Sequence, residues 1–125
     1  MNVLDSSAWI EILKDGPFAD QLQTIAENVH QLLVPALVLH EVVRYALRNH
    51  GRRVADEIAL SMQRSLVVPV TASLAQQSAI LGVRHNLPLA DSIVYATAQA
   101  HSAILYTLDQ DFEKLPKVKF LKRRS

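Results

Sequence analysis

The sequence predicts a three-layer α/β/α domain with a mostly parallel central sheet of four to five strands. Its strand-like segments are short and almost uniformly apolar, which is typical of strands covered on both faces. Segments with helical periodicity separate them, in the order β-α-α-β-α-α-β-α-α-β with a further strand at the end. The chain has 125 residues, half of them hydrophobic, and no internal repeat or linker, so a single domain over residues 1–125 is expected.

The first half of the chain holds two strand-like segments, each followed by two helical ones. The first helix is expected to be capped by Ser6 and Ser7 and to end at Gly16. The expected segments are a strand over Met1–Leu4, that first helix, a helix from Phe18 to about Asn28, a strand over Leu32–Val34, a helix from Ala36 to about Asn49, and a helix marked by Val54, Ile58 and Met62.

The second half repeats this alternation. Leu66–Val70 is strongly β-type, and Pro69 indicates an edge strand or a strand end. Ser73 and Gln76 have the spacing of a capping box, which opens a helix to about Val83. The remaining expected segments are a helix from near Leu89 to about His101, a strand over Ala103–Leu108 and a last strand over Val118–Leu121.

Composition excludes several kinds of site. The chain has no cysteine, so it has no disulfide, thiolate zinc site or iron–sulfur cluster, and this fits an expected cytoplasmic location. No signal peptide or membrane-spanning run is visible, so no membrane partner is expected. Three glycines cannot build a Gly-rich nucleotide loop, and the five histidines lack metal-binding spacing.

Charge is distributed unevenly along the chain. The net charge is +1, yet residues 114–125 carry six basic residues and no acid, which leaves 7 basic and 12 acidic residues in the rest. A basic tail can bind phosphate through counterion release. A solvated terminus explains the same composition equally well, so both interpretations stand.

Four carboxylates occupy positions where α/β proteins place their ligands. Asp5 and Asp109 each follow a strand, and Glu41 and Asp91 lie near the starts of helices. Ligands of such sheets bind outside the carboxyl ends of the strands. Because all four acids are flanked by apolar segments, they are expected to be partly desolvated and to repel one another. A hard cation such as Mg²⁺ or Mn²⁺ would relieve that repulsion.

Each of these acids also has a purely structural explanation. A strand-end aspartate can cap a helix or form an Asx turn, and an acid in a first helical turn complements the helix dipole. Glu41 can pair with Arg44, and Asp111 with Lys114, at spacings that suit helical ion pairs. The case for a site therefore depends on the acids acting jointly.

Four segments of the sequence resemble the PIN-domain nucleases, and specifically the VapC-type toxins of prokaryotic toxin–antitoxin pairs. The third and fourth are the most specific, and the resemblance extends over essentially the whole chain. The segments are Val3-Leu4-Asp5-Ser6-Ser7, Pro35 to Val42, Leu87-Pro88-Leu89-Ala90-Asp91-Ser92, and Tyr106-Thr107-Leu108-Asp109-Gln110-Asp111-Phe112.

The resemblance implies a PIN-like fold and a metal-dependent endoribonuclease that uses Mg²⁺ or Mn²⁺. It also implies an RNA substrate, a VapB-type antitoxin as partner and a homodimer. The residues that match the family's catalytic and metal-binding acids are Asp5, Glu41, Asp91 and Asp109. Those that match supporting positions near the metal are Ser6, Thr107 and Asp111.

Two further expectations concern binding surfaces. Arg44 and Arg48 share a helical stripe with Glu41, so they and the basic tail are candidate contacts for RNA phosphates. The early helices, with Trp9, Ile10, Leu13 and Leu22, are expected to supply an apolar groove for the antitoxin.

Two alternatives to the nuclease remain at this point. One is a PIN-like domain that binds RNA without cleaving it. The other is a receiver-type phosphoacceptor domain, although that fold needs an acceptor aspartate where Leu66–Val70 is followed by Thr71.

Overall fold

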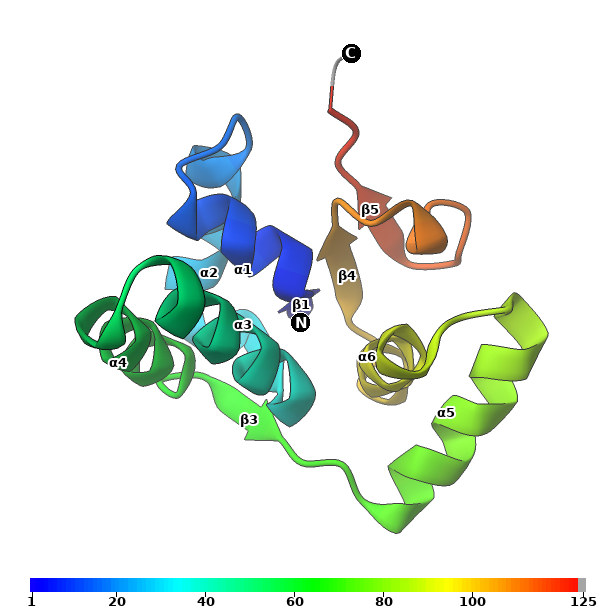
Figure 1. The fold of residues 1–125 in the computed structure, drawn as a ribbon. Helices are drawn as coiled ribbons and strands as arrows, with labels where there is room; N and C mark the ends of the chain where they lie inside the picture. The colour runs from blue at the N-terminus through cyan, green and yellow to red at the C-terminus, as the bar shows by residue number, and fades with distance from the viewer. Residues whose placement is uncertain (124–125) are drawn as a thin grey trace.

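A wholly parallel sheet forms the centre of the computed structural model, which describes residues 1–123 (Figure 1). The strands lie in the order β3-β2-β1-β4-β5. This arrangement confirms the predicted fold class, with every neighbouring pair parallel. The strand bounds are β1 (Asn2–Leu4), β2 (Leu32–Pro35), β3 (Leu66–Val68), β4 (Ile104–Thr107) and β5 (Val118–Phe120).

Helices cover both faces of the sheet. α1 packs against α2 and α3, α3 packs against α4, and α5 packs against α6. The first four lie on one side of the strands, and α5 and α6 lie on the other (Figure 1). The helix bounds are α1 (Ser6–Leu13), α2 (Ala19–Glu27), α3 (Ala36–Asn49), α4 (Arg52–Met62), α5 (Ala72–His85) and α6 (Leu89–Ala100), with short 3₁₀ turns η1 (Val29–Gln31) and η2 (Gln110–Phe112).

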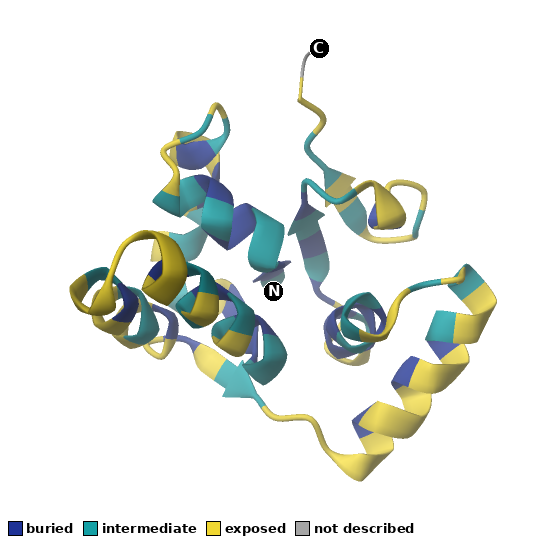
Figure 2. Cartoon of the chain, viewed as in Figure 1, coloured by how far each residue is buried: buried dark blue, intermediate teal, exposed yellow. Residues whose placement is uncertain are grey.

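The core lies on the central strands, as their apolar sequences require. Val3, Leu4, Leu33, Val34 and Leu105 are all essentially inaccessible to solvent. Figure 2 shows burial concentrated at the strands and on the inward faces of the helices. A continuous apolar core of this kind fixes the register of the central strands, and so it fixes where each strand ends.

The strand β3 lies at the edge of the sheet, as Pro69 predicted. Leu66 is 60% exposed there, and its strand pairs with β2 alone. The strand ends at Val68 rather than at Val70.

The predicted capping box at Ser73 and Gln76 is wrong. Thr71 caps α5, and its side-chain oxygen accepts a hydrogen bond from the backbone N–H of Leu74 at 3.1 Å. Ser73 and Gln76 are polar and have the spacing of a capping box, but the helix begins two residues earlier than this pattern predicts, just after the edge strand. The helix also continues to His85 and ends at Asn86, which takes the left-handed conformation with φ of 54°.

The expected antitoxin groove on the early helices is only partly available. Trp9 and Leu22 are buried in the core at 2% and 0% exposure, so they face the protein interior. Ile10 and Leu13 remain partly exposed. None of the helices in the described residues is long and apolar enough to cross a membrane. Arg124, the last basic residue of the tail, lies outside the described residues.

Candidate metal site at the carboxyl edge of the sheet

The order of the strands creates a switch point between β1 and β4. The chain moves from β1 outward to β2 and β3, and then returns to the other side of β1 with β4. Asp5 follows β1 and Asp109 follows β4, so both lie at the carboxyl edge on either side of this point. The backbone N–H of Asp5 donates to the carbonyl of Tyr106 at 3.2 Å, which extends the pairing to the site. Crevices at such points are where α/β sheets bind ligands.

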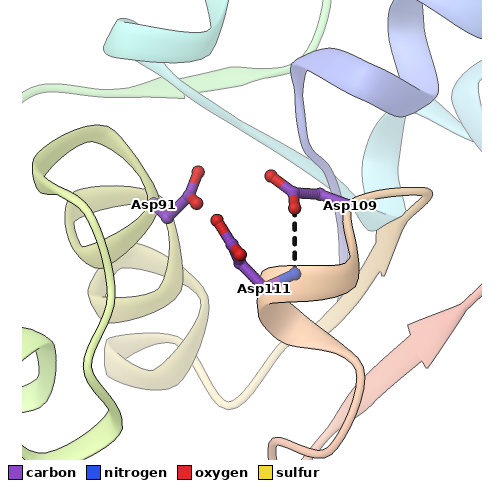
Figure 3. A group of neighbouring side chains, drawn as sticks. All are labelled: Asp91, Asp109 and Asp111. Atoms are coloured by element: carbon purple, nitrogen blue, oxygen red, sulfur yellow. Dashed lines mark hydrogen bonds between the residues drawn. The ribbon is translucent and has the colours of Figure 1, made fainter.

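Three carboxylates from separate elements converge beside this point (Figure 3). Asp91 lies in the first turn of α6, Asp109 follows β4 and Asp111 lies in η2. One oxygen from each lies within 4.8 Å of the others. Asp109 is held by its own turn, since its side chain accepts a hydrogen bond from the backbone N–H of Asp111 at 2.9 Å.

Burial and the neighbouring carboxylates raise the pKa of Asp91. Partial burial, hydrogen bonding with Asp111 and the charges of Asp109, Asp111 and Asp5 together raise the pKa of Asp91 from 3.8 to about 7. The desolvation of the carboxylate is the largest of these causes. A cation placed among these carboxylates would stabilise the ionised form of Asp91 and lower its pKa.

Asp5 is buried, and its carboxylate is held by three hydrogen bonds. Ser7 donates through its hydroxyl to Oδ1 at 2.6 Å, the backbone N–H of Ala8 donates to the same oxygen at 3.0 Å, and Thr107 donates through Oγ1 to Oδ2 at 2.5 Å. Burial raises the pKa of Asp5, and these hydrogen bonds oppose that shift. The expectation that Ser6 and Ser7 cap the first helix is therefore wrong, because Asp5 caps α1 and both serines lie in its first turn.

Glu41 lies on α3 at the side of Asp5, and it is half-buried. Desolvation and the negative charge of Asp5 raise the pKa of Glu41, while the Ser6 side chain and His40 oppose the shift. A groove of about 540 Å³ passes this residue, and its lining includes Ser6, Arg44 and Arg48.

The structure thus separates the predicted acids into a tight group and two neighbours. Asp91 and Asp109 converge with Asp111, which the sequence placed only in a supporting role. Asp5 lies outside this group but raises the pKa of Asp91 through its charge, and it raises the pKa of Glu41 in the same way. Within residues 1–123 the ion pairs are Arg52–Asp56, Arg53–Glu57 and Arg123–Glu11, so neither the Glu41–Arg44 nor the Asp111–Lys114 pair forms.

Sequence reasoning missed the role of Ser7. It favoured Ser6, whereas Ser7 bonds Asp5 and also accepts from the backbone N–H of Leu108 at 2.9 Å. The Asp-Ser-Ser run signals a hydroxyl beside Asp5 without saying which serine turns toward it. Ser6 turns toward the groove beside Glu41 instead.

The donor set fits a hard divalent cation. All the converging groups are carboxylate oxygens, and Mg²⁺ and Mn²⁺ prefer such ligands. Burial raises the pKa of Asp91 most, and the charges of Asp109, Asp111 and Asp5 add to the shift, so a cation among these carboxylates would offset their mutual repulsion.

Comparison with known protein families gives one direct assignment. A family model described as the PIN domain matches residues 3–118. The chain belongs to the PIN-domain family. The resemblance found in its four sequence segments is therefore confirmed, and the receiver-type alternative is set aside.

Several solved structures of other proteins share this fold. A toxin–antitoxin complex from Klebsiella pneumoniae aligns with a TM-score of 0.79 and 23% identity, covering 95% of this chain and 96% of that one. The Mycobacterium tuberculosis toxin VapC20, described as cleaving the sarcin–ricin loop, aligns with a TM-score of 0.73 and 22% identity over the full length of both chains. DNA-bound VapBC from Salmonella typhimurium aligns with a TM-score of 0.69 and 14% identity, covering 97% and 98% of the two chains. A search of curated proteins gave no match.

Proposed function

We propose that this PIN-domain protein is a Mg²⁺- or Mn²⁺-dependent endoribonuclease that acts as the toxin of a toxin–antitoxin pair. One observation carries the proposal: the carboxylate oxygens of Asp91, Asp109 and Asp111 converge within 4.8 Å at the switch point of the sheet. Family membership supports the nuclease class, and the VapC and VapBC structures among its structural relatives support the toxin role.

In this proposal the acids have different roles, which follow from their different surroundings. Asp91, Asp109 and Asp111 would hold the metal ion, which when bound lowers the pKa of a water molecule and offsets charge on the phosphate. Asp5 is fixed by Ser7, Ala8 and Thr107, so its carboxylate would keep one orientation as substrate enters.

Glu41 would act as the base that receives a proton from the attacking water. Its pKa is raised above the usual range, which brings proton acceptance closer to neutral pH. It also borders the groove that would admit the RNA strand. Arg44 and Arg48 line this groove and would contact RNA phosphates, offsetting the repulsion between RNA and the acids.

The toxin role includes partners. We infer a VapB-type antitoxin, because structural relatives of this chain were solved as toxin–antitoxin complexes. A homodimer and a cytoplasmic location complete the proposal. The partly exposed Ile10 and Leu13, without Trp9 and Leu22, remain available to an antitoxin on α1.

The test is cleavage of a labelled single-stranded RNA with Mg²⁺ or Mn²⁺, compared with the same reaction in EDTA. The variant Asp91→Asn removes one carboxylate from the cluster, and Asp20→Asn is the matched control because Asp20 is exposed on α2. We expect cleavage by the wild type and by Asp20→Asn only when metal is present, and a loss of at least about 100-fold in Asp91→Asn.

Two outcomes would contradict the proposal. Cleavage by Asp91→Asn at the wild-type rate would rule out the cluster as the site. Metal-independent RNA binding without cleavage would favour the alternative of a PIN-like domain that only binds RNA.

A further inference from the structure

A buried acid outside the metal cluster, Glu11, is held rigidly on α1. Its side chain is inaccessible to solvent. The backbone N–H of Phe18 donates to Oε2 at 3.0 Å, and a Cβ atom at Gly16 would overlap the carboxylate. The turn after α1 is thus built around this carboxylate, and the orientation of its second oxygen is fixed.

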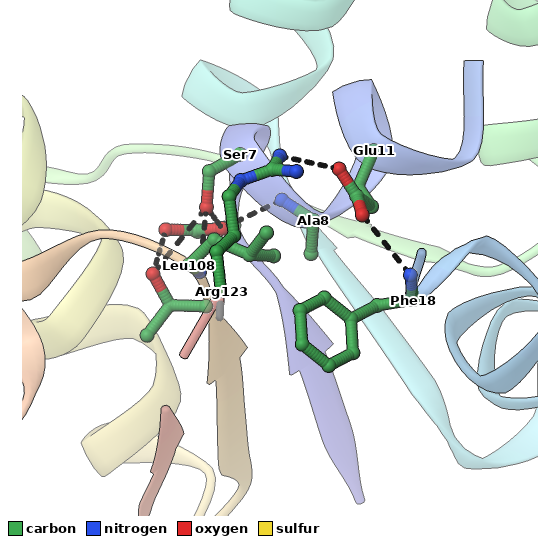
Figure 4. A network of polar contacts seen from close by, with 8 residues as sticks. Ser7, Ala8, Glu11, Phe18, Leu108 and Arg123 are labelled. Atoms are coloured by element: carbon green, nitrogen blue, oxygen red, sulfur yellow. Dashed lines mark hydrogen bonds and ion pairs between the residues drawn. The ribbon is translucent and has the colours of Figure 1, made fainter. Parts of the chain in front are cut away.

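That second oxygen, Oε1, binds the guanidinium of Arg123 at 2.5 Å (Figure 4). The two residues are 112 positions apart in the chain. A buried carboxylate needs such a partner, because an unpaired charge in the interior is costly. The Arg123 side chain nevertheless stays 50% exposed, and Glu11 is its one partner within residues 1–123. Among the residues that the structure describes, its other N–H donors have no acceptor and can reach another group.

Arg123 lies beside the candidate site. It lies two residues after Leu121, whose backbone N–H donates to the carbonyl of Thr107 at 2.8 Å. Its anchor, Glu11, lies one helical turn after Ser7 on the same face of α1, and Ser7 bonds Asp5. Figure 4 draws Arg123, Glu11 and Ser7 in one group of polar contacts, so the guanidinium lies near the network around Asp5.

The two basic groups near the acids lie on opposite sides of β1. Arg44 and Arg48 lie on α3, which follows the neighbouring strand β2. Arg123 follows β5, on the side of β4. A strand of RNA that crosses the acids from α3 would therefore meet Arg123 on leaving them.

We propose that Arg123 binds a backbone phosphate of the RNA beyond the cleaved bond, and that Glu11 is the positioning residue that aims it. The inference rests on the proposed ribonuclease function. A guanidinium held by a carboxylate on one edge presents its other donors in a fixed fork, which matches the geometry of a phosphate. The pair is electrically balanced in the free protein, so it adds a phosphate contact without leaving an uncompensated buried charge.

The experiment measures kcat and KM for single-stranded RNA, in Mg²⁺, at several salt concentrations. Arg123→Gln removes the guanidinium, and Arg64→Gln is the matched control, since it removes the same charge from an exposed position just before β3, at the edge of the sheet opposite the acids. We expect Arg123→Gln to raise KM roughly tenfold at nearly unchanged kcat, and to lower the slope of log KM against log salt by about 0.7. Arg64→Gln is expected to change KM by less than about twofold.

A double variant separates phosphate binding from a purely structural role. Arg123→Gln alone leaves Glu11 buried without its partner and is expected to lower the melting temperature. Glu11→Gln combined with Arg123→Gln keeps the net charge of the wild type and is expected to restore most of that stability. If Arg123 binds phosphate, the raised KM persists in the double variant.

Three results would overturn the inference. Recovery of the wild-type KM in the double variant would show that Arg123 only stabilises the fold. Equal KM values for Arg123→Gln and Arg64→Gln would show a general effect of charge. A wild-type protein that neither binds nor cleaves RNA would overturn the proposed function, and this inference with it.

Discussion

At the residue scale, Asp5 and Asp109 each cap a helical element and also present a carboxylate at the carboxyl edge of the sheet. Asp5 caps α1 through the backbone N–H of Ala8, and Asp109 caps η2 through that of Asp111. These are the structural roles that the sequence offered as alternatives to a site. The structure shows that they do not compete, because the hydrogen bonds that cap an element also fix the orientation of the carboxylate.

Thr107 joins these two aspartates, and it provides a test at this scale. It is fully buried, donates to Asp5 and accepts from the backbone N–H of Asp109 at 2.9 Å. Thr107→Val keeps the shape but leaves both partners unsatisfied, so we expect the free energy of unfolding in urea to fall by about 1–3 kcal/mol. RNA cleavage is expected to fall as well, because Asp5 loses one of its orienting bonds.

Thr107→Ser is the control for this prediction. It keeps the hydroxyl and removes a methyl group, so it is expected to retain cleavage while losing about 1 kcal/mol of stability. Equal cleavage by the valine and serine variants would show that the hydroxyl does not orient Asp5 in the reaction.

At the scale of elements, the position of Asp91 depends on how closely α5 and α6 pack. Gly82 on α5 faces Ser92 on α6, and a Cβ atom at position 82 would lie 3.0 Å from the Cβ of Ser92. Ser92 in turn bonds the carbonyls at the start of its own helix, at Pro88 and Leu89. A larger residue at position 82 therefore presses on the turn that carries Asp91.

We expect Gly82→Val to lower the melting temperature by several degrees, corresponding to an overpacking cost of about 1–3 kcal/mol. Ala79→Val is the matched control, because Ala79 is exposed on the same helix. The Ala79→Val variant is expected to lose only the small difference in helix propensity between alanine and a β-branched residue. Thermal unfolding followed by circular dichroism compares the two, and equal melting temperatures would contradict close packing at Gly82.

At the scale of the whole molecule, the acids at the carboxyl edge make stability depend on pH and metal. The pKa of Asp91 is about 7 in the folded protein against an ordinary value of 3.8, so the folded state holds the proton more tightly than the unfolded state. Between these values the unfolded chain binds fewer protons, and the free energy of unfolding falls as pH rises. This loss is complete above about pH 7.

Asp91→Asn is therefore expected to be more stable than the wild type at pH 8 in EDTA, by about 1 kcal/mol after allowance for solvent screening. The difference is expected to shrink toward pH 4, where the wild-type carboxyl is protonated in the folded state. Mg²⁺ is expected to raise the melting temperature of the wild type at pH 8 and to have little effect on Asp91→Asn. Thermal unfolding in EDTA and in Mg²⁺ at the two pH values measures all three effects. A difference that does not vary with pH would contradict the role of Asp91 protonation.

The sequence by itself determined the order of the elements and the edge of the sheet at which the acids lie. Apolar periodicity and strand ends are local properties, and they remain readable because each extends over only a few residues. Parallel strands then place Asp5 and Asp109 at one edge in any arrangement of this fold class. For the same reason the edge position of β3 was readable from Pro69.

Only the tertiary structure decided which side chains meet. It brought Asp111 into the carboxylate group, turned Ser7 rather than Ser6 toward Asp5, and buried Trp9 in the core. It also joined Arg123 to Glu11 across 112 residues of chain. Contacts of this kind depend on the packing of whole helices against the sheet and on the side-chain orientation that each packed position permits, and no local pattern of residues encodes either.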